Sequence, residues 1–379
     1  MSDALLMGDK MENKMRIERT RLRAFEVASL AVVLVLGFST SQAAADGCED
    51  AGEYSYICGP VSAEDLVLIP GTKLVIASGF GGGASLYLVD SEQKTWSSLY
   101  PADEPRARQN MKVYGACPGS PDPSNFVAHG LNIRPGADGH STLYVVGHGE
   151  REAIEVFDVD PGADVPVLTW TGCVMTPDGM EANSVASLAD GSLLATIPLH
   201  TGVLINEAFT GKPTGAVYAW TPGNAGFKKL EGTDMPYANG IEVSDDGQEF
   251  FVASSGLQKV LAYSNTRPSR LIRSSRALSF IPDNLHMSSD GNLITAGMAI
   301  VDSVCGDVAM SSEFDLGEFA SCPRPFTVLA IDPQSMHGSI LTSSHAQQYF
   351  SNITMALVVG SELWMGTFAG DRIAYRDLE

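Results

Sequence analysis

The chain repeats one short pattern six times: a strand-forming run, a tight turn that carries a glycine, and a second strand-forming run. The first runs are Asp65–Ile69, Gly130–Ile133, Ser184–Leu188, Gly240–Ser244, Leu285–Ser288 and Thr354–Val359. The turns lie at Pro70-Gly71, Asp138-Gly139, Asp190-Gly191, Asp246-Gly247, Asp290-Gly291 and Gly360. The second runs are Leu74–Ser78, Thr142–Val146, Leu193–Ile197, Glu249–Ala253, Leu293–Ala296 and Leu363–Gly366. Repeated units bury their faces against one another, so the pattern predicts one closed array.

Strand-rich repeats punctuated by glycine are typical of propeller blades. Further strand-forming runs, such as Ala153–Val159 and Gly215–Trp220, lie between the repeats. We therefore predict an all-β fold, a six-bladed β-propeller with four antiparallel strands per blade. The run Arg372–Arg376 follows the last repeat, and we expect the stretch after Asp46 to add a strand to that blade. Such sharing closes the ring without leaving an exposed edge.

Residues 1–45 have the pattern of a signal peptide. Four arginines precede the apolar run Val27–Phe38, and the small residues Ala43-Ala44-Ala45 then offer a cleavage site before Asp46. We expect a propeller domain over residues 46–379 in a secreted or periplasmic protein. The alternative is that the segment is retained as a membrane anchor.

Cysteine content and charge agree with export. All six cysteines lie beyond residue 45, and an even number in an exported chain predicts disulfides. The Cys305–Cys322 pair would close one long insertion. Cys48–Cys58 and Cys117–Cys173 are guesses by elimination, since six cysteines allow about 15 connectivities. The chain carries a net charge of −21. That charge disfavours nucleic acid and anionic membranes as partners, so a small molecule is the expected partner.

Polar residues recur at one position of the repeat. They stand just before the first strand, or at its start, as Glu64, His129, Asn183, Asn239 and the pair Asp283-Asn284. Asn183, Asn239 and Asp283 each precede the aspartate of their turn by seven residues, and Glu64 precedes Pro70 by six, which one bulge accommodates. Inner strands of a propeller line its channel, so these side chains are expected to converge at one mouth. The alternative is that they are ordinary turn residues.

The oxygen donors of this set predict a calcium site at the centre of the propeller. Glu64 and Asp283 supply carboxylates, and the three asparagines supply amide carbonyls. Calcium binds six to eight hard oxygens in flexible geometry, whereas zinc prefers His and Cys ligands at a spacing that this chain lacks.

His129 and His148 belong to the second repeat and are expected at the same end of its hairpin. A pair of histidines beside a cation can act as a general base, because one imidazole accepts a proton from water while the other fixes its tautomer. The alternative is two unrelated histidines at a polar rim.

Several segments together resemble the paraoxonase/arylesterase family, within the wider senescence-marker-protein and gluconolactonase-like propellers. They are Ser62-Ala63-Glu64-Asp65-Leu66, His129-Gly130-Leu131, Gly147-His148, Glu181-Ala182-Asn183-Ser184, Tyr237-Ala238-Asn239-Gly240-Ile241, Pro282-Asp283-Asn284-Leu285, Gly366-Thr367-Phe368 and Ala374-Tyr375. The family has six-bladed propellers with calcium in the central tunnel, and it hydrolyses lactones and aryl esters. The resemblance covers most of the chain from about residue 58 onward.

The resemblance implies roles for individual residues. Glu64, Asn183, Asn239, Asp283 and Asn284 would hold the catalytic calcium, and His129 with His148 would form the catalytic dyad. Asp65, the Leu131 carbonyl and Ser184 match the family's second, structural calcium site, but Ser184 replaces an expected aspartate, which weakens such a site. Arg376 occupies the position of the family's C-terminal cysteine, so closure of the last blade requires strand pairing or another bridge.

The sequence thus predicts a calcium-dependent carboxylic-ester hydrolase of lactones or aryl esters, with Asp283 as an alternative base to the histidine pair. One alternative is a single-metal sugar-lactone hydrolase of the gluconolactonase type. Another is a propeller without catalytic activity that calcium merely stabilises. Two long segments, 100–125 with Met111 and Tyr114 and 300–325 with Phe319, are expected to act as apolar lids over the channel mouth, and the alternative is that they only decorate the surface.

Overall fold

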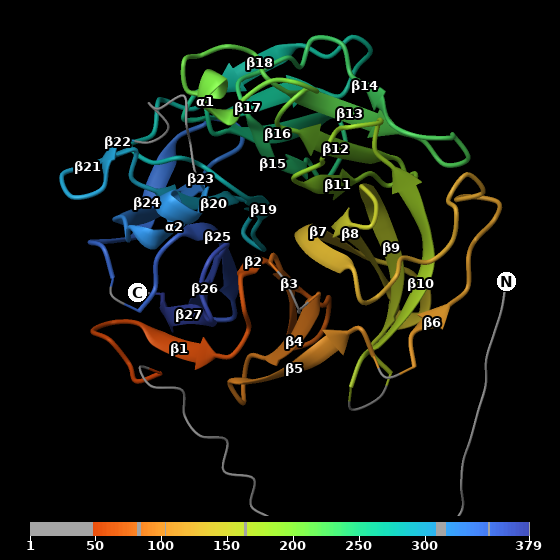
Figure 1. Cartoon of the computed structure of the whole chain (residues 1–379), viewed down its shortest axis with the longest axis horizontal. Coiled ribbons are helices and arrows are strands. Elements are labelled where there is room, and N and C mark those ends of the chain that lie inside the picture. The colour runs from red at the N-terminus through yellow and green to blue at the C-terminus, as the bar shows by residue number, and fades with distance from the viewer. Residues whose placement is uncertain are drawn as a thin grey trace, which may run out of the picture. The chain divides into compact units, whose positions relative to one another are not determined.

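The computed structural model describes residues 48–81, 85–102, 104–162, 165–307, 316–347 and 349–378 (Figure 1). The leader predicted for residues 1–45 lies outside these residues. The described part forms six antiparallel sheets arranged as blades around a central channel. Neighbouring blades contact each other around the ring, and the sixth contacts the first. The six-bladed propeller expected from the repeats is therefore confirmed.

Each blade has four antiparallel strands, ordered from the channel outward. Blades one to three are β2 (Ala63–Leu68), β3 (Leu74–Gly79), β4 (Leu86–Asp90) and β5 (Thr95–Tyr100); β7 (Phe126–Pro135), β8 (Ser141–Gly149), β9 (Ala153–Asp160) and β10 (Val167–Met175); and β11 (Val185–Ser187), β12 (Leu193–Ile197), β13 (Ala216–Trp220) and β14 (Lys228–Lys229). Blades four to six are β15 (Ala238–Val243), β16 (Glu249–Ser254), β17 (Lys259–Ser264) and β18 (Leu271–Ser274); β19 (Leu285–Met287), β20 (Leu293–Met298), β23 (Phe326–Ile331) and β24 (Gly338–Ser344); and β25 (Ile353–Val359), β26 (Glu362–Thr367), β27 (Arg372–Asp377) and β1 (Ser55–Cys58).

Short elements decorate this frame. They are β6 (Arg106–Ala107), which pairs parallel to β10, the hairpin of β21 (Val301–Asp302) and β22 (Gly306–Asp307), the 3-10 turn Ala137–Gly139, and the helices α1 (Ile205–Ala208) and α2 (Leu316–Ser321).

The predicted turns form because their glycines adopt positive φ angles, which other residues reach only with strain. The φ angles are 76° at Gly71, 80° at Gly139, 83° at Gly191, 66° at Gly247, 81° at Gly291 and 63° at Gly360. The turn aspartates add hydrogen bonds: the Ser192 amide donates to Asp190 Oδ1 at 2.8 Å. Each turn therefore reverses the chain between the first and second strands, which fixes their register.

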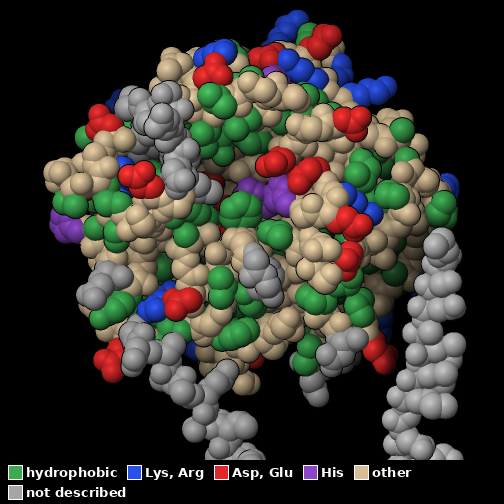
Figure 2. Space-filling view, viewed as in Figure 1, with side chains coloured by type: hydrophobic (Ala, Val, Ile, Leu, Met, Phe, Trp, Pro, Cys, Tyr) green, Lys and Arg blue, Asp and Glu red, His purple; other side chains and the backbone are tan. Residues whose placement is uncertain are grey.

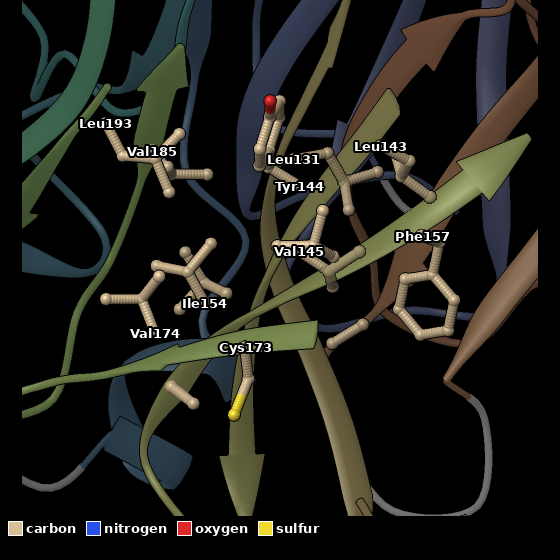
Figure 3. Packing of buried hydrophobic residues seen from close by; sticks show 14 of the residues in the cluster. Leu131, Leu143, Tyr144, Val145, Ile154, Phe157, Cys173, Val174, Val185 and Leu193 are labelled. Carbon is tan, nitrogen blue, oxygen red and sulfur yellow. The ribbon is translucent and has the colours of Figure 1, made fainter. Parts of the chain in front are cut away.

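Apolar side chains fill the spaces between and within blades. The largest buried cluster joins the first three blades, and Figure 3 shows part of it, with Leu131 and Val145 packed near Ile154 and Phe157. Leu131 and Leu143 are completely buried. Each fully buried side chain of this size contributes about 1.5–3 kcal/mol to folding. The channel-facing residues are thus held by a dry, close-packed frame.

The N-terminal strand closes the ring, as expected. β1 pairs antiparallel with β27, with Ser55 opposite Tyr375 and Cys58 opposite Arg372. Arg376, which replaces the expected cysteine, instead forms an ion pair with Glu53 at 2.5 Å. Strand pairing and this ion pair together join the two ends of the propeller domain.

All three expected disulfides are present: Cys48–Cys58, Cys117–Cys173 and Cys305–Cys322. Among the described residues no cysteine is free. Structural disulfides persist in oxidising compartments, so they agree with an exported protein. Within the same residues, no helix has the length and apolar character needed to cross a bilayer.

Candidate active site

The predicted site residues lie at the channel ends of the inner strands, where regular pairing is interrupted. In three blades the ladder shifts register at the site position, between Ala63 and Leu66, Ala128 and Leu131, and Ala238 and Ile241. Bulges of this kind redirect side chains and are frequent beside active sites. A register shift is present at Glu64, but the same shift occurs at Asn239, so it does not account for the shorter spacing at Glu64. In blades three and five the site residues precede β11 and β19 by one or two positions.

Two glycines allow neighbouring inner strands to approach closely at this level. A Cβ atom on Gly130 would lie 2.4 Å from the Asn183 carbonyl oxygen, and one on Gly240 would lie 2.5 Å from the Leu285 amide nitrogen. The Gly240 amide donates to the Asp283 carbonyl at 3.1 Å. The small residues after His129 and Asn239 thus hold adjacent blades together and bring their site residues close to each other.

The five predicted calcium ligands converge. Glu64, Asn183, Asn239 and Asp283 line one cavity, and Asn284 donates from Nδ2 to Glu64 Oε1 at 2.7 Å. Four oxygens of this set are buried without a hydrogen-bond partner: Glu64 Oε2, Asn183 Oδ1, Asn239 Oδ1 and Asn284 Oδ1. Buried polar atoms are nearly always paired, so a cluster of unpaired acceptors requires a missing partner. A cation satisfies acceptors only, which fits this set.

The amide orientations agree with that interpretation. Asn284 Nδ2 donates to Glu64, and Asn239 Nδ2 donates to Ser255 Oγ at 3.1 Å. These bonds occupy the two amide nitrogens and leave both Oδ1 atoms without a partner. In the described part of the chain, no three His, Cys, Asp or Glu side chains form a metal cluster by themselves. The convergence depends on amide oxygens, as hard-cation sites allow.

The carboxyl groups of Glu64 and Asp283 are both buried at this site and repel each other. Burial, followed by the neighbouring Asp65 carboxylate, raises the pKa of Glu64 well above its usual value. Burial, followed by Glu64, likewise raises the pKa of Asp283. Both groups therefore favour a positive neighbour, either a proton or a cation.

The two predicted histidines are in direct contact. His129 Nδ1 lies 3.0 Å from His148 Nε2. His129 Nε2 points the other way and lies 3.6 Å from Glu64 Oε1. Phe80 stacks on the His129 ring with centroids 4.2 Å apart. Burial lowers the pKa of His129 to about 4, so its imidazole is neutral at neutral pH.

Sequence reasoning missed Glu152, which supports the pair from behind. Its Oε2 lies 2.5 Å from His148 Nδ1. A carboxylate only accepts, so His148 donates from Nδ1. In the tautomer where His148 Nε2 carries no proton, it accepts from His129 Nδ1, and the lone pair on His129 Nε2 then faces the predicted calcium ligands. The spacing of four residues from His148 to Glu152 was visible in the sequence, but it is uninformative without the hairpin geometry.

The sixth repeat contributes Thr354 at the same structural position. Thr354 Oγ1 donates to the Glu64 carbonyl at 2.6 Å, and the Asn284 amide donates to the Thr354 carbonyl at 2.9 Å. Thr354 therefore ties the fifth and sixth blades to the first, and it orients Glu64 without supplying a free acceptor.

Residues assigned to a second calcium form another layer. Asp65 accepts from the Leu131 amide at 2.7 Å, and His286 Nε2 lies 2.6 Å from Asp65 Oδ1. Burial alone lowers the pKa of His286, but the Asp65 carboxylate, with Glu242 and Glu64, outweighs burial and raises it to about 9. Ser184 Oγ accepts from the Ile241 amide at 3.4 Å.

Above the ligands the cavity is apolar and has a volume of about 360 Å³. Its wall includes Ile205 of α1, Phe209, Phe319 of α2 and Phe368. An adjoining cavity of about 620 Å³ shares His129 and is lined by His148, Glu152, Glu181 and His200. Figure 2 shows histidine side chains at the centre of this face, between acidic and hydrophobic ones. The histidine pair thus lies between an apolar and a polar compartment.

Of the two segments expected to act as lids, only 300–325 contributes a side chain to the wall of the apolar cavity. Phe319 lines the apolar cavity, but Tyr114 is buried against Trp220, with stacked rings 5.5 Å apart. Met111 is 64% exposed and does not line the cavity. The segment 100–125 therefore packs on blades two and three instead of covering the channel. Ile205 and Phe209, from the unpredicted α1 segment between β12 and β13, line the cavity instead.

Comparison with solved structures supports the fold. A luciferin-regenerating enzyme is 13% identical with a TM-score of 0.51, covering 85% of this chain and 93% of that one. A provisionally described gluconolactonase is 15% identical with a TM-score of 0.51, covering 86% and 92%. The calcium-binding protein regucalcin from Agrobacterium tumefaciens is 11% identical with a TM-score of 0.49, covering 85% and 92%.

Neither a described sequence family nor a curated protein matches the chain. At these identities the likeness establishes the six-bladed propeller fold and nothing finer. The resemblance to paraoxonases in particular stays a prediction.

Proposed function

We propose that this protein is a calcium-dependent hydrolase of lactones or aryl esters. The observation that carries the proposal is the cluster of four unpaired buried oxygens beside two histidines in hydrogen-bond contact. Glu64, Asn183, Asn239, Asp283 and Asn284 would hold the ion. A bound calcium ion supplies electrostatic stabilisation for the negative charge that develops on a substrate carbonyl oxygen.

The residues of the chain supply the base. His129 Nε2 carries the lone pair and removes a proton from a water molecule held in the cavity. His129 becomes positively charged in that step, and His148 accepts its Nδ1 hydrogen bond while Glu152 balances the charge. Glu152 would act here as the carboxylate of a hydrolytic triad does, by fixing the tautomer of the histidine beside it. Phe80 and the apolar wall restrict water around the base.

The wall of the cavity favours hydrophobic substrates. Ile205, Phe209, Phe319 and Phe368 present apolar surface to the part of a substrate farthest from the ligands. An acyl lactone or an aryl ester buries such surface, whereas a sugar lactone would leave its hydroxyl groups without partners there. The polar adjoining cavity, with Glu181 and His200, supports a gluconolactonase-type reaction as the second candidate.

One assay panel tests these alternatives. The purified protein is given an acyl lactone, an aryl ester and gluconolactone, each with calcium and with a chelator, while circular dichroism monitors the fold. Calcium-dependent hydrolysis of the first two supports the proposal, and hydrolysis of gluconolactone alone supports the second candidate. A folded, calcium-loaded protein that hydrolyses none of them would favour a scaffold role.

A further inference from the structure

His286 is a buried titratable residue that the proposed reaction does not use. It lies in β19, in the fifth blade, and its side chain is 11% exposed. Its Nε2 atom lies 2.6 Å from Oδ1 of Asp65, which belongs to β2 in the first blade. These blades are not neighbours, because the sixth lies between them. The contact therefore bridges non-adjacent blades beneath the predicted calcium ligands.

Both carboxylate oxygens of Asp65 already accept hydrogen bonds. Its Oδ1 atom accepts from the Leu66 amide at 2.8 Å as well as from His286, and its Oδ2 atom accepts from the Leu131 amide at 2.7 Å. The contrast with the adjacent Glu64 is direct, since Glu64 Oε2 is buried without any partner. Of these two consecutive carboxylates, Asp65 has hydrogen-bond donors at both oxygens, whereas Glu64 has one oxygen without a donor.

The other groups around this layer are also occupied. Ser184 offers a hydroxyl where a carboxylate would be needed, and its Oγ accepts from Ile241. The His286 Nδ1 atom lies 4.0 Å from Oε2 of Glu242, and that oxygen also accepts from the Met287 amide at 3.2 Å. The residues matched to a second calcium ion therefore do not fit one.

We propose that the imidazole of His286 fills the place of a second cation, so that the protein binds one calcium ion and no more. The inference rests on the calcium site of the proposed function and adds its stoichiometry. Asp65, Leu131, Glu242 and His286 come from four blades. His286 therefore joins the fifth blade to the first by a hydrogen bond to Asp65 that needs no metal.

The test counts bound ions. Wild-type protein is dialysed against excess calcium, freed of unbound ion, and analysed by elemental mass spectrometry and calorimetric titration. We expect one ion per chain. The double variant His286→Ala/Ser184→Asp exposes Asp65 and supplies the missing carboxylate, and we expect its calcium content to double. His140→Ala serves as the matched control, because His140 pairs with Asp158 at the surface at 3.0 Å, and it should retain one ion.

The outcomes separate the two proposals. Two ions in the wild type would overturn the inference and leave the proposed function standing. No ion in the wild type would overturn the proposed calcium site and the count together. If the double variant does not fold, His286→Gln gives the second measurement. Glutamine can still donate to Asp65, so we expect one ion, and a second ion would contradict the role given to the side chain at this position.

Discussion

Glu152 and His148 decide which nitrogen of His129 is free in the proposed reaction. The hydrogen-bond chain runs from Glu152 Oε2 through both rings and ends with the lone pair at His129 Nε2. The carboxylate cannot donate, so it fixes the proton on His148 Nδ1, and the proposed reaction uses the tautomer in which His148 Nε2 accepts from His129. The chemistry assigned to His129 therefore depends on a residue that touches neither the cavity ligands nor His129 itself.

Replacing His129 tests the base directly. We expect His129→Gln to lower kcat by about 10²–10⁴-fold, the usual contribution of a general base. Calcium affinity and the circular dichroism spectrum should be unchanged, since glutamine fills similar space. Full activity in this variant would exclude the histidine as base and transfer the role to another group, such as Asp283, while the calcium role would stand.

Replacing Glu152 tests the positioning role. We expect Glu152→Gln to lower kcat by about 10–100-fold with little change in KM, in line with other residues that orient a reacting group. A glutamine can present its NH₂ group to His148 and so favour the wrong tautomer. Glu152→Asp should recover part of the activity, and Glu150→Gln, at an exposed neighbouring position, serves as the control. Equal activity in the two glutamine variants would contradict the role.

The pH dependence of the reaction reports the state of His129. Burial lowers its pKa to about 4, and a bound cation would lower it further. The imidazole thus stays neutral as pH falls through the ordinary histidine range near 6.5. With calcium kept saturating, kcat/KM should hold from pH 7 down to about pH 5 before it declines. An acid limb centred near 6.5 would show that the base is a solvated histidine.

Among elements, the strands were predictable and the elements around the channel mouth were less so. The Asp-Gly turns and the short apolar runs beside them define β12 and β16 in the sequence, because both are local signals. The register shift at Glu64 does not follow from its spacing, because the same shift occurs at Asn239, where the spacing is one residue longer. Helix α1 was not predictable, because its four residues carry no periodicity, and its role comes from lining the cavity.

Contacts across the channel were beyond sequence reasoning for a physical reason. His286 and Asp65 are separated by 221 positions, and nothing local distinguishes a channel-facing histidine from one buried between blades. Tyr114 illustrates the opposite error. An aromatic residue in a long, glycine-rich segment suggested a lid, but stacking on Trp220 buries more apolar surface than an exposed position over the cavity.

The α2 segment offers a test at the scale of elements. Phe319 lines the apolar cavity and stacks on Phe368 with ring centroids 6.4 Å apart, and the Cys305–Cys322 disulfide anchors the segment. We expect Phe319→Ala to raise KM about tenfold or more for a long-chain acyl lactone, given about 1.5–3 kcal/mol for burying such a side chain. A short-chain lactone should show a smaller change.

Val304→Ala is the matched control for this variant, because Val304 belongs to the same insertion and is 86% exposed. Its KM values should equal those of the wild type. If Phe319→Ala raised KM equally for long and short substrates, Phe319 would serve the shape of the segment and not the recognition of the acyl chain.

For the whole domain, the propeller frame should survive loss of calcium. The blades are joined by buried apolar clusters, by the pairing of β1 with β27, and by the contact of His286 with Asp65, and none of these needs a cation. Removing the ion leaves Glu64 and Asp283 to take up protons, because their pKa values are raised in its absence. We therefore expect a chelator to abolish hydrolysis while the β-sheet circular dichroism signal persists at 25 °C.

The apparent stability should fall by about 2.7 kcal/mol between calcium at a hundredfold excess over Kd and none, which thermal unfolding at graded calcium concentrations measures. Activity should return in full when calcium is restored, whereas unfolding on chelation would mean that the ion, and not the frame, holds the blades together.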